Sequence, residues 1–258
     1  MSKLEIVRIP VLNDNYVWLA HEPSQNLTAV VDPAVADAPL AEAAKRGWAI
    51  THILNTHHHG DHVGGNLEIK SKTGCTIVGP RADKDRIPGI DIEVGDGDTY
   101  AFGDATAAVF DVPGHTRGHI AYWFPESDAL FCGDTLFLLG CGRLFEGTPG
   151  QMWNSLGKLK VLPDSAQIYC AHEYTQSNAR FAVTVDPDNA DLAAWVAEID
   201  RKRAAGEPTV PADLGTEKRT NPFLRADDPG VAAAVGLSGQ SAVDVFAEVR
   251  QRKDGFRG

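Results

Sequence analysis

The sequence predicts an α/β protein in which a layered sandwich of sheets and helices is followed by a small helical domain. Over the first two-thirds of the chain, short runs rich in Val, Ile and aromatic residues alternate with helical patterns. Such a mixture is typical of layered α/β folds. After His172 the helical patterns continue alone, and we expect no strand there. The 258 residues suffice for one full core and a smaller appended unit, so we place one domain over residues 1–172 and a helical domain over 173–258.

The predicted strands are short and are separated by turn residues, such as the run 95–98 (GDGD). They cover residues 4–9, 16–20, 28–32, 52–55, 76–78, 99–102, 107–111, 119–124, 129–132 and 167–170.

The predicted helices begin among the strands and continue to the end of the chain. Two of them, 39–46 and 66–72, carry basic residues in the last turn and a glycine just beyond it. The others cover residues 151–161, 175–184, 189–205, 230–236 and 242–253. The segment 206–224 is the longest predicted loop, because four prolines or glycines precede Glu217 within it.

The composition excludes several classes of protein. The net charge is −11, whereas a nucleic-acid partner requires a basic face. No apolar run reaches the length of a membrane span, and the first residues lack an apolar signal-peptide core, so we expect neither a membrane partner nor export. The four cysteines stand singly, without a C-x-x-C pair, which suits buried thiols in a reducing compartment. We therefore expect a cytoplasmic protein.

Residues 56–62 (THHHGDH) form a dense group of metal-competent side chains directly after the predicted strand 52–55. His57 and His59 stand two apart, so their rings point to the same side of an extended segment. Asp61 and His62 follow at once, and neighbouring glycines allow a tight turn into a helix. Four potential ligands exceed the needs of one tetrahedral site, so the motif implies two metal ions.

Three further predicted strands are each followed by one metal-competent side chain. His115 lies in the turn after strand 107–111, Asp134 follows strand 129–132, and His172 follows strand 167–170. Taken singly, each is more often an ordinary loop residue, and a histidine run alone also occurs in solvated loops. Together they converge, because α/β folds gather functional residues at strand ends.

The remaining histidines have other interpretations. His58 fills the position between two candidate ligands, and we expect it not to bind metal. His119 stands four residues after His115, which makes it either a group that orients a ligand from behind or a structural histidine. We expect His21 and His52 to be structural or on the surface.

On these motifs the chain resembles glyoxalase II, the hydroxyacylglutathione hydrolase branch of the metallo-β-lactamase superfamily, over nearly its whole length. The histidine motif is shared by the whole superfamily, whereas the run 140–143 (GCGR) and the C-terminal pattern R-x-x-K-D point to this branch. The resemblance implies an α/β fold, the metallo-β-lactamase αββα sandwich with a C-terminal helical domain. The matching segments are 56–65, 114–119, 133–136, 140–147, 171–175, 221–224 and 249–256.

The resemblance also implies seven ligands for two divalent metal ions. Three hold the first ion, three hold the second, and the seventh bridges both: His57, His59 and His115; Asp61, His62 and His172; and Asp134. Asp61 and Asp134 thereby take part in catalysis. We expect zinc, with iron or manganese as alternatives, because a ligand set without cysteine does not select one metal.

By the same resemblance, glutathione-binding groups fall on Arg143, Tyr174, Arg250 and Lys253, which makes 173–258 a substrate-binding domain. The basic tail supports an anionic substrate, although cations that complement a helix dipole at a solvated helix end are the alternative. Two positions depart from better-known relatives, which carry lysine in place of Arg143 and often tyrosine in place of Phe145.

These residues predict hydrolysis of glutathione thioesters, chiefly S-lactoylglutathione, to a 2-hydroxy acid such as lactate plus glutathione. A metal-bridged hydroxide would perform the attack, because a dinuclear site lowers the pKa of its bound water. We find no dedicated general acid; a thiolate leaves without one, whereas an amide nitrogen requires one. The resemblance places this reaction second in methylglyoxal detoxification.

Other functions remain open from the residues alone. A glutathione persulfide dioxygenase would use one iron held by two histidines and a carboxylate, and metal stoichiometry would distinguish it. Another hydrolase of the superfamily, such as a lactonase or lactamase, or a non-catalytic binding module are further alternatives. For partners, we expect a small-molecule thioester only, and a monomeric chain.

Overall fold

The computed structural model describes residues 2–258, and these divide into two compact units. Unit 1 comprises residues 2–111, Thr116–Gly133 and Tyr169–His172. Unit 2 comprises Val112–His115, Asp134–Ile168 and Glu173–Gly258.

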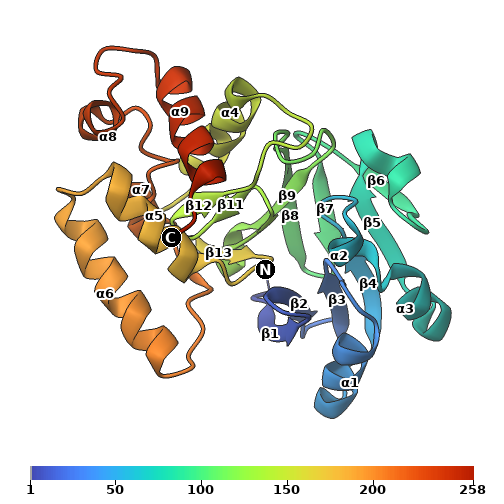
Figure 1. Cartoon of the computed structure of the whole chain (residues 1–258). Helices are drawn as coiled ribbons and strands as arrows, with labels where there is room; N and C mark the ends of the chain where they lie inside the picture. The colour runs from blue at the N-terminus through green and yellow to red at the C-terminus, as the bar shows by residue number, and fades with distance from the viewer. Residues whose placement is uncertain (1) are drawn as a thin grey trace. The chain divides into compact units, whose positions relative to one another are not determined.

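The first sheet of unit 1 has six strands in the order β1-β2-β3-β4-β5-β6 (Figure 1). The first three pair antiparallel and the rest pair parallel. Parallel neighbours need crossover connections, and α1 (Asp37–Arg46) and α3 (Asn66–Thr73) lie in two of them. The strands are β1 (Glu5–Val11), β2 (Asn15–Glu22), β3 (Leu27–Val31), β4 (Ile50–Leu54), β5 (Thr76–Pro80) and β6 (Ile92–Val94).

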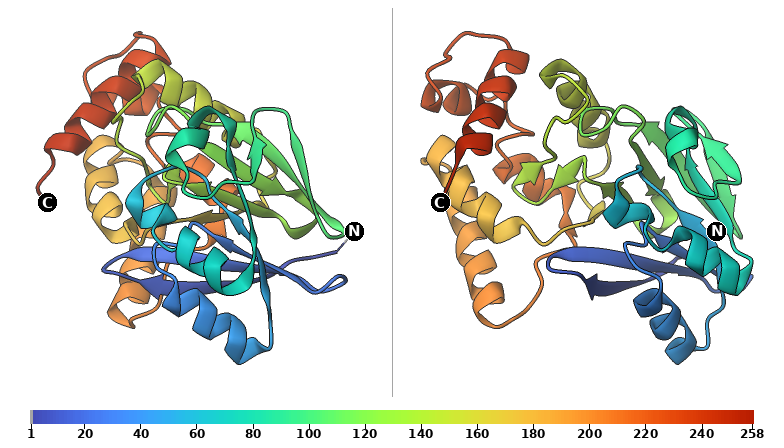
Figure 2. Two further views of the ribbon diagram at one scale, coloured as in Figure 1. Left: turned by 90° about the vertical axis from the view of Figure 1, so that its right-hand side faces the viewer. Right: turned by 45° about the vertical axis from the view of Figure 1, so that its right-hand side comes forward.

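Both crossover helices pack on this sheet (Figure 2). Ala43 of α1 and Ile69 of α3 share one buried apolar cluster with side chains of the strands. Each helix ends as predicted, at a glycine in the left-handed conformation, with φ of 72° at both Gly47 and Gly74.

The second sheet of unit 1 runs β7-β8-β9-β10 and continues into the end of β13. Its strands are β7 (Thr99–Phe102), β8 (Ala105–Asp111), β9 (Ile120–Phe124), β10 (Ala129–Gly133) and β13 (Gln167–Cys170). Two buried polar contacts connect it to the first sheet. The Tyr122 hydroxyl donates to Asn55 O at 3.1 Å, and Trp18 Nε1 donates to Cys170 O at 3.0 Å. The first of these contacts attaches Asn55, the residue directly after β4, to the second sheet.

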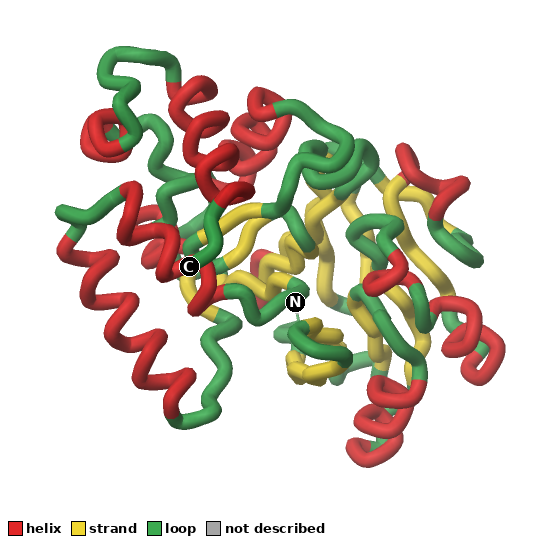
Figure 3. The backbone as a smooth tube through the Cα atoms, in the orientation of Figure 1, coloured by secondary structure: helices red, strands yellow, loops and turns green. Residues whose placement is uncertain are grey.

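Unit 2 is mainly helical: its helices are labelled α4 to α9 in Figure 1 and drawn in red in Figure 3. Thr148 and Gln151 form a capping box at the start of α4, in which each side chain binds the other residue's backbone. Asn189 and Ser241 cap α6 and α9 more simply: each side chain accepts a hydrogen bond from a backbone N–H of the first helical turn. The helices are α4 (Pro149–Lys160), α5 (Thr175–Val185), α6 (Ala190–Ala204), α7 (Leu214–Thr220), α8 (Pro229–Ala234) and α9 (Ala242–Gly255).

Two predictions about the C-terminal region are wrong. We expected no strand after His172, but β14 (Ala212–Asp213) pairs with the start of β13. We expected a loop over 206–224, but α7 lies within it, because Asp213 accepts a hydrogen bond from Thr216 N and caps a helix only seven residues long. The seven residues of α7 (LGTEKRT) contain one large apolar side chain, Leu214, so no repeating apolar pattern marks this helix in the sequence.

Several short elements were not predicted from the sequence. The missing elements are β6, the hairpin of β11 (Leu136–Phe137) and β12 (Gly140–Cys141), α2 (Gly60–Val63) and the 3-10 turns Arg81–Arg86 and Pro125–Ser127. Each is too short for a repeating apolar pattern to form. All ten predicted strands and all seven predicted helices are present, with ends shifted by a few residues.

The four cysteines are free and buried, as predicted. Within residues 2–258, no helix combines the length and the apolar character required to cross a membrane.

Candidate metal centre

The histidine motif turns from strand to helix at the end of β4. His59 is extended, with ψ of 147°, and forms the N-cap of α2. Asn55 Nδ2 donates to His62 O at 3.0 Å and so spans the motif. A Cβ on Gly64 would lie 2.5 Å from Ala34 O, so only glycine allows α2 to lie this close to the loop after β3.

In unit 1, potential ligand atoms from the motif and from Asp32 and His172 form two groups of three. Asp61, His62 and His172 form one group, and Asp32, His57 and His62 form the other; the ligand atoms of each lie within 4.8 Å of one another. His59 lies beside the second group, because its Nδ1 is 3.1 Å from His57 Nε2. Imidazole nitrogens and carboxylate oxygens are ligands for divalent zinc, iron and manganese, so the donor set fits such ions. These His/Asp groups are consistent with a binuclear metal site.

The Asp61 group is oriented by polar neighbours. Asp14 Oδ1 lies 2.9 Å from Nδ1 of His172, and Asn15 Nδ2 donates to Asp61 Oδ2 at 3.0 Å. The opposite nitrogen of His172, Nε2, lies 3.5 Å from that same oxygen. A carboxylate on Nδ1 fixes the tautomer that leaves the Nε2 lone pair for a metal.

Asp32 was not among the predicted site residues. It lies directly after β3, is only 3% exposed, and has its backbone in the left-handed region, with φ of 48°. Its carboxylate accepts from Thr56 N at 2.8 Å and from the Thr56 hydroxyl at 2.6 Å, and it lies 3.1 Å from His62 Nδ1. The sequence did offer one signal for Asp32. It is a carboxylate directly after β3, and β3 is the neighbour of β4, which leads into the histidine motif.

We expect Asp32→Asn to weaken metal binding by about 10- to 100-fold. That is the usual loss when the group that holds the second ring nitrogen of a metal-binding histidine is removed, and Asp32 holds Nδ1 of His62 in this way. Competition with a chromophoric chelator measures the affinity. Asp37→Asn, whose side chain is 92% exposed, is the matched control. Unchanged affinity in Asp32→Asn would show that the carboxylate does not orient His62.

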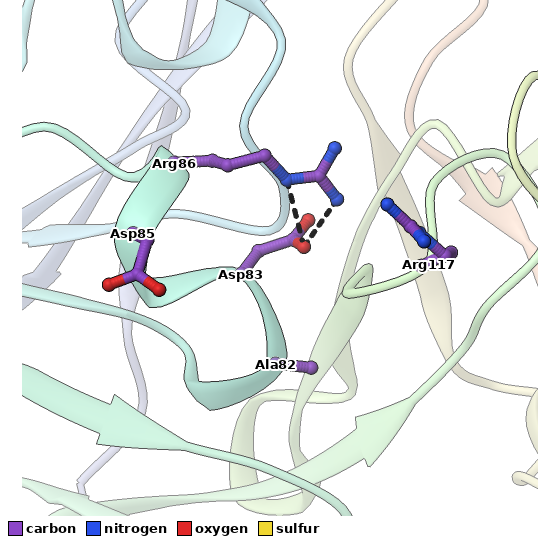
Figure 4. A pocket seen from close by; sticks show the side chains of 5 residues that line it. All are labelled: Ala82, Asp83, Asp85, Arg86 and Arg117. Atoms are coloured by element: carbon purple, nitrogen blue, oxygen red, sulfur yellow. Dashed lines mark hydrogen bonds and ion pairs between the residues drawn. The ribbon is translucent and has the colours of Figure 1, made fainter.

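The side chain of His58 contacts Arg86 and Asp83. Its Nε2 accepts from Arg86 Nη1 at 3.1 Å, and its Nδ1 lies 3.1 Å from Asp83 Oδ2. Arg86 also binds the second oxygen of Asp83, as Figure 4 shows. These residues border a cleft of about 340 Å³ lined by Ala82, Asp83, Asp85, Arg86 and Arg117.

His119 is fully buried and supports His57 from behind. The two rings stack with centroids 4.5 Å apart and planes 17° apart. Nδ1 of His119 lies 3.0 Å from Ile120 O, so it carries the proton and donates. His21 is buried against Trp48, and burial lowers the pKa of half-buried His52.

His115 and Asp134 belong to unit 2, where they lie together. His115 Nε2 is 3.5 Å from Asp134 Oδ2, and the side chains are 5% and 10% exposed. His115 Nδ1 donates to Arg143 O at 2.9 Å. As with His172, a partner on Nδ1 leaves the Nε2 lone pair available for a metal. The ring of Phe145 lies 5.2 Å from that of His115.

Three of the four predicted substrate-binding residues contribute to a group of cations in unit 2. Burial and the charges of Arg250, Arg180 and Arg143 together lower the pKa of Lys253 to about 8, against the opposing effect of Asp254. Arg143 and Arg180 are exposed. The sequence prediction missed Arg180, although it is a basic residue on the helix that begins beside Tyr174.

The predicted substrate-binding residues differ in their surroundings. Arg250 is only 5% exposed, donates to Cys141 O at 3.0 Å and pairs with Asp254 at 2.8 Å. Lys253 is half-buried and donates to Ser177 O at 3.1 Å. The ring of Tyr174 lies edge-on to Phe137, 5.2 Å between centroids.

Two family models match the chain, and together they account for most of it. The model of the metallo-beta-lactamase superfamily matches residues 12–172, and that of the hydroxyacylglutathione hydrolase C-terminus matches residues 173–256. Among curated relatives, the hydroxyacylglutathione hydrolase of Methylococcus capsulatus is 58% identical over 99% of this chain and 100% of its own length. That of Rhodospirillum rubrum is 57% identical over the same shares of both chains.

Solved structures show the same fold at much lower identity. ETHE1 from Myxococcus xanthus matches with a TM-score of 0.69 and 22% identity over 96% of this chain and 89% of its own. A metallo-beta-lactamase from Staphylococcus aureus matches with a TM-score of 0.67 and 21% identity over 98% of this chain and 72% of its own. The predicted fold class, a metallo-β-lactamase fold with a C-terminal helical domain, is confirmed. The chain therefore belongs to the hydroxyacylglutathione hydrolases, the glyoxalase II branch of the metallo-beta-lactamase superfamily.

Proposed function

We propose that this chain hydrolyses S-D-lactoylglutathione and related glutathione thioesters to a 2-hydroxy acid and glutathione. Water supplies the OH of the new carboxyl group and the proton of the released thiol. Family membership over the full length supports the activity. The observation that carries the chemistry is the group of Asp61, His62 and His172, whose ligand atoms lie within 4.8 Å of one another.

For the metal ligands, we propose the assignment that the resemblance implies. One ion is held by His57, His59 and His115, the other by Asp61, His62 and His172, and Asp134 serves both. The second set coincides with a ligand group of unit 1. The 3.5 Å distance between His115 Nε2 and Asp134 Oδ2 supports assigning these two to a common ion. Zinc is our proposal for both ions.

When bound, two such ions lower the pKa of a water molecule and polarise the thioester carbonyl. The protein residues supply orientation. Asn15 donates to Oδ2 of Asp61, the oxygen that lies 3.5 Å from His172 Nε2. The second oxygen of this carboxylate would orient the attacking water. The leaving thiolate has an ordinary pKa of about 8.5 and needs no strong acid beside it.

We propose that residues 173–258 are the substrate-binding domain and that Arg143, Tyr174, Arg250 and Lys253 bind the glutathione part. Burial and nearby arginine charges lower the pKa of Lys253, and this convergence of positive charge supports an anionic ligand there. Glutathione carries two carboxylates, which suit such a group. The buried, free cysteines support a reducing compartment, the cytoplasm, and we propose that the chain acts there as a monomer.

We expect elemental analysis of protein prepared without chelator to give two equivalents of zinc, iron and manganese together. Steady-state hydrolysis of S-D-lactoylglutathione should disappear on chelation and return when metal is added back. One equivalent in fully active protein would contradict the binuclear assignment. Oxygen consumption with glutathione persulfide, without thioester hydrolysis, would favour the dioxygenase alternative instead.

A further inference from the structure

The hairpin β11–β12 is unusual in how many side chains hold its backbone. A two-stranded hairpin is marginal by itself, and this one pairs only Leu136 with Cys141 and Phe137 with Gly140. Its turn contains Leu139 at φ of 55°, which is unfavourable for leucine. The conformation therefore depends on contacts from outside the hairpin.

The end of α7 provides three of these contacts. Glu217 accepts from Leu139 N at 2.7 Å. Asn221 Nδ2 donates to Phe137 O and Gly140 O, each at 3.1 Å, and to Glu217 at 2.9 Å. Both side chains are fully buried, at 0% exposure.

Helices α5 and α9 provide two more. Asn178 Nδ2 donates to Leu138 O at 3.0 Å, and Arg250 Nη1 donates to Cys141 O at 3.0 Å. Leu139 completes the attachment by packing in an apolar cluster with Ala182 of α5 and Leu192 of α6. Every residue from 137 to 141 thus has a backbone group bound by one of four buried side chains, which we term the hairpin brace: Asn178, Glu217, Asn221 and Arg250.

The other end of the hairpin meets the proposed metal ligands of unit 2. Asp134 and Thr135 lead into β11, and Gly142 N donates back to Thr135 O at 3.3 Å. A Cβ on Gly142 would lie 2.0 Å from Asp134 O and 3.0 Å from His115 Nδ1, so the backbone lies directly against both residues. His115 Nδ1 then donates to Arg143 O. A shift of the hairpin would therefore move His115 and Asp134.

We infer that Glu217 and Asn221 are positioning residues, which hold His115 and Asp134 in place for metal binding through the β11–β12 hairpin. The inference rests on the proposed metal ligands and gives the helical region a second task besides binding glutathione. The positioning role also gives a function to the segment 221–224, which resembles the family in sequence but had no role assigned to it. Hydrogen bonds from buried polar side chains hold a backbone in one arrangement, and a metal ligand needs that precision.

The test is the zinc affinity of the whole chain, measured by competition with a chromophoric chelator. Asn221→Asp keeps the shape of the side chain but replaces the amide that donates to Phe137 O and Gly140 O with an acceptor. We expect about 10- to 100-fold weaker binding, the usual loss when a group behind a metal ligand is removed. Glu217→Gln keeps an acceptor for Leu139 N and should bind zinc like the unsubstituted chain, whereas Glu217→Ala should not.

Asn189→Asp is the matched control, because it makes the same change in unit 2 at a side chain that contacts Asp186 and Arg219 O instead of the hairpin. Thermal unfolding of the metal-free proteins checks that all variants fold. If Asn221→Asp does not fold, Asn178→Ala, which removes the single bond to Leu138 O, carries the same expectation.

The reference variant is His115→Ala. If it binds zinc as tightly as the unsubstituted chain, the proposed ligand set is wrong, and this inference is overturned with it. If His115→Ala weakens binding but folded Asn221→Asp and Glu217→Ala bind like the control, only the positioning role is overturned.

Discussion

Asp134→Ala should lower kcat for S-D-lactoylglutathione by at least about a thousandfold, the largest loss we expect from a single substitution. Asp134 is the one ligand we assign to both ions, and each bound ion would stabilise the charge of the transition state by several kcal/mol. The side chain is only 10% exposed, so water does not readily replace its carboxylate. Removing it should also lower the metal content of the purified protein below two equivalents.

The control is Asp188→Ala, which removes an exposed aspartate of the same unit. It should change neither metal content nor kcat. Asp134→Glu is a second variant, because it keeps the charge but displaces the oxygen by one methylene group. If Asp134→Ala retains two metal ions and most of its activity, Asp134 does not bridge the ions.

The sheets and the histidine motif could be predicted because their sequence patterns are local. Each predicted strand is a short run of β-branched and aromatic residues, and the period of such a run depends little on the rest of the fold. The proposed ligands His115, Asp134 and His172 follow the ends of strands, so placing the strands also indicated their positions. The GCGR run and the tail then pointed to the branch, which the comparisons bear out.

Contacts between distant segments could not be predicted from the same patterns. Asp32 is 24 residues from Thr56 in sequence, and nothing local shows that its carboxylate meets that residue. The β11–β12 hairpin has two residues in each strand, and its attachment comes from Glu217 and Asn221, about 80 residues away. The role of Arg250 is similar, because only the fold shows that it reaches Cys141 O.

Lys253→Ala should raise KM for S-D-lactoylglutathione by about 10- to 150-fold with little change in kcat, the loss expected for one charged hydrogen bond worth about 1.5–3 kcal/mol. Lys253 is a cleaner test than Arg250, since Arg250 also holds the hairpin. Arg257→Ala removes a charge from the same tail, where Arg257 contacts only nearby carbonyls, and is the control. Equal KM values in the two variants would place glutathione elsewhere.

The pH dependence of the same reaction gives an independent check on Lys253. Burial and the charges of Arg250, Arg180 and Arg143 hold its pKa at about 8, with Asp254 opposing them. In the free enzyme the lysine therefore loses its charge as the pH rises through 8, and an anionic substrate should then bind less well, so kcat/KM should fall above that pH. Lys253→Arg stays protonated throughout this range. Other titrating groups affect both proteins equally, so the difference between their kcat/KM profiles isolates Lys253. We expect the fall near pH 8 to be absent from Lys253→Arg, and parallel profiles would show that the charge of Lys253 does not meet the substrate.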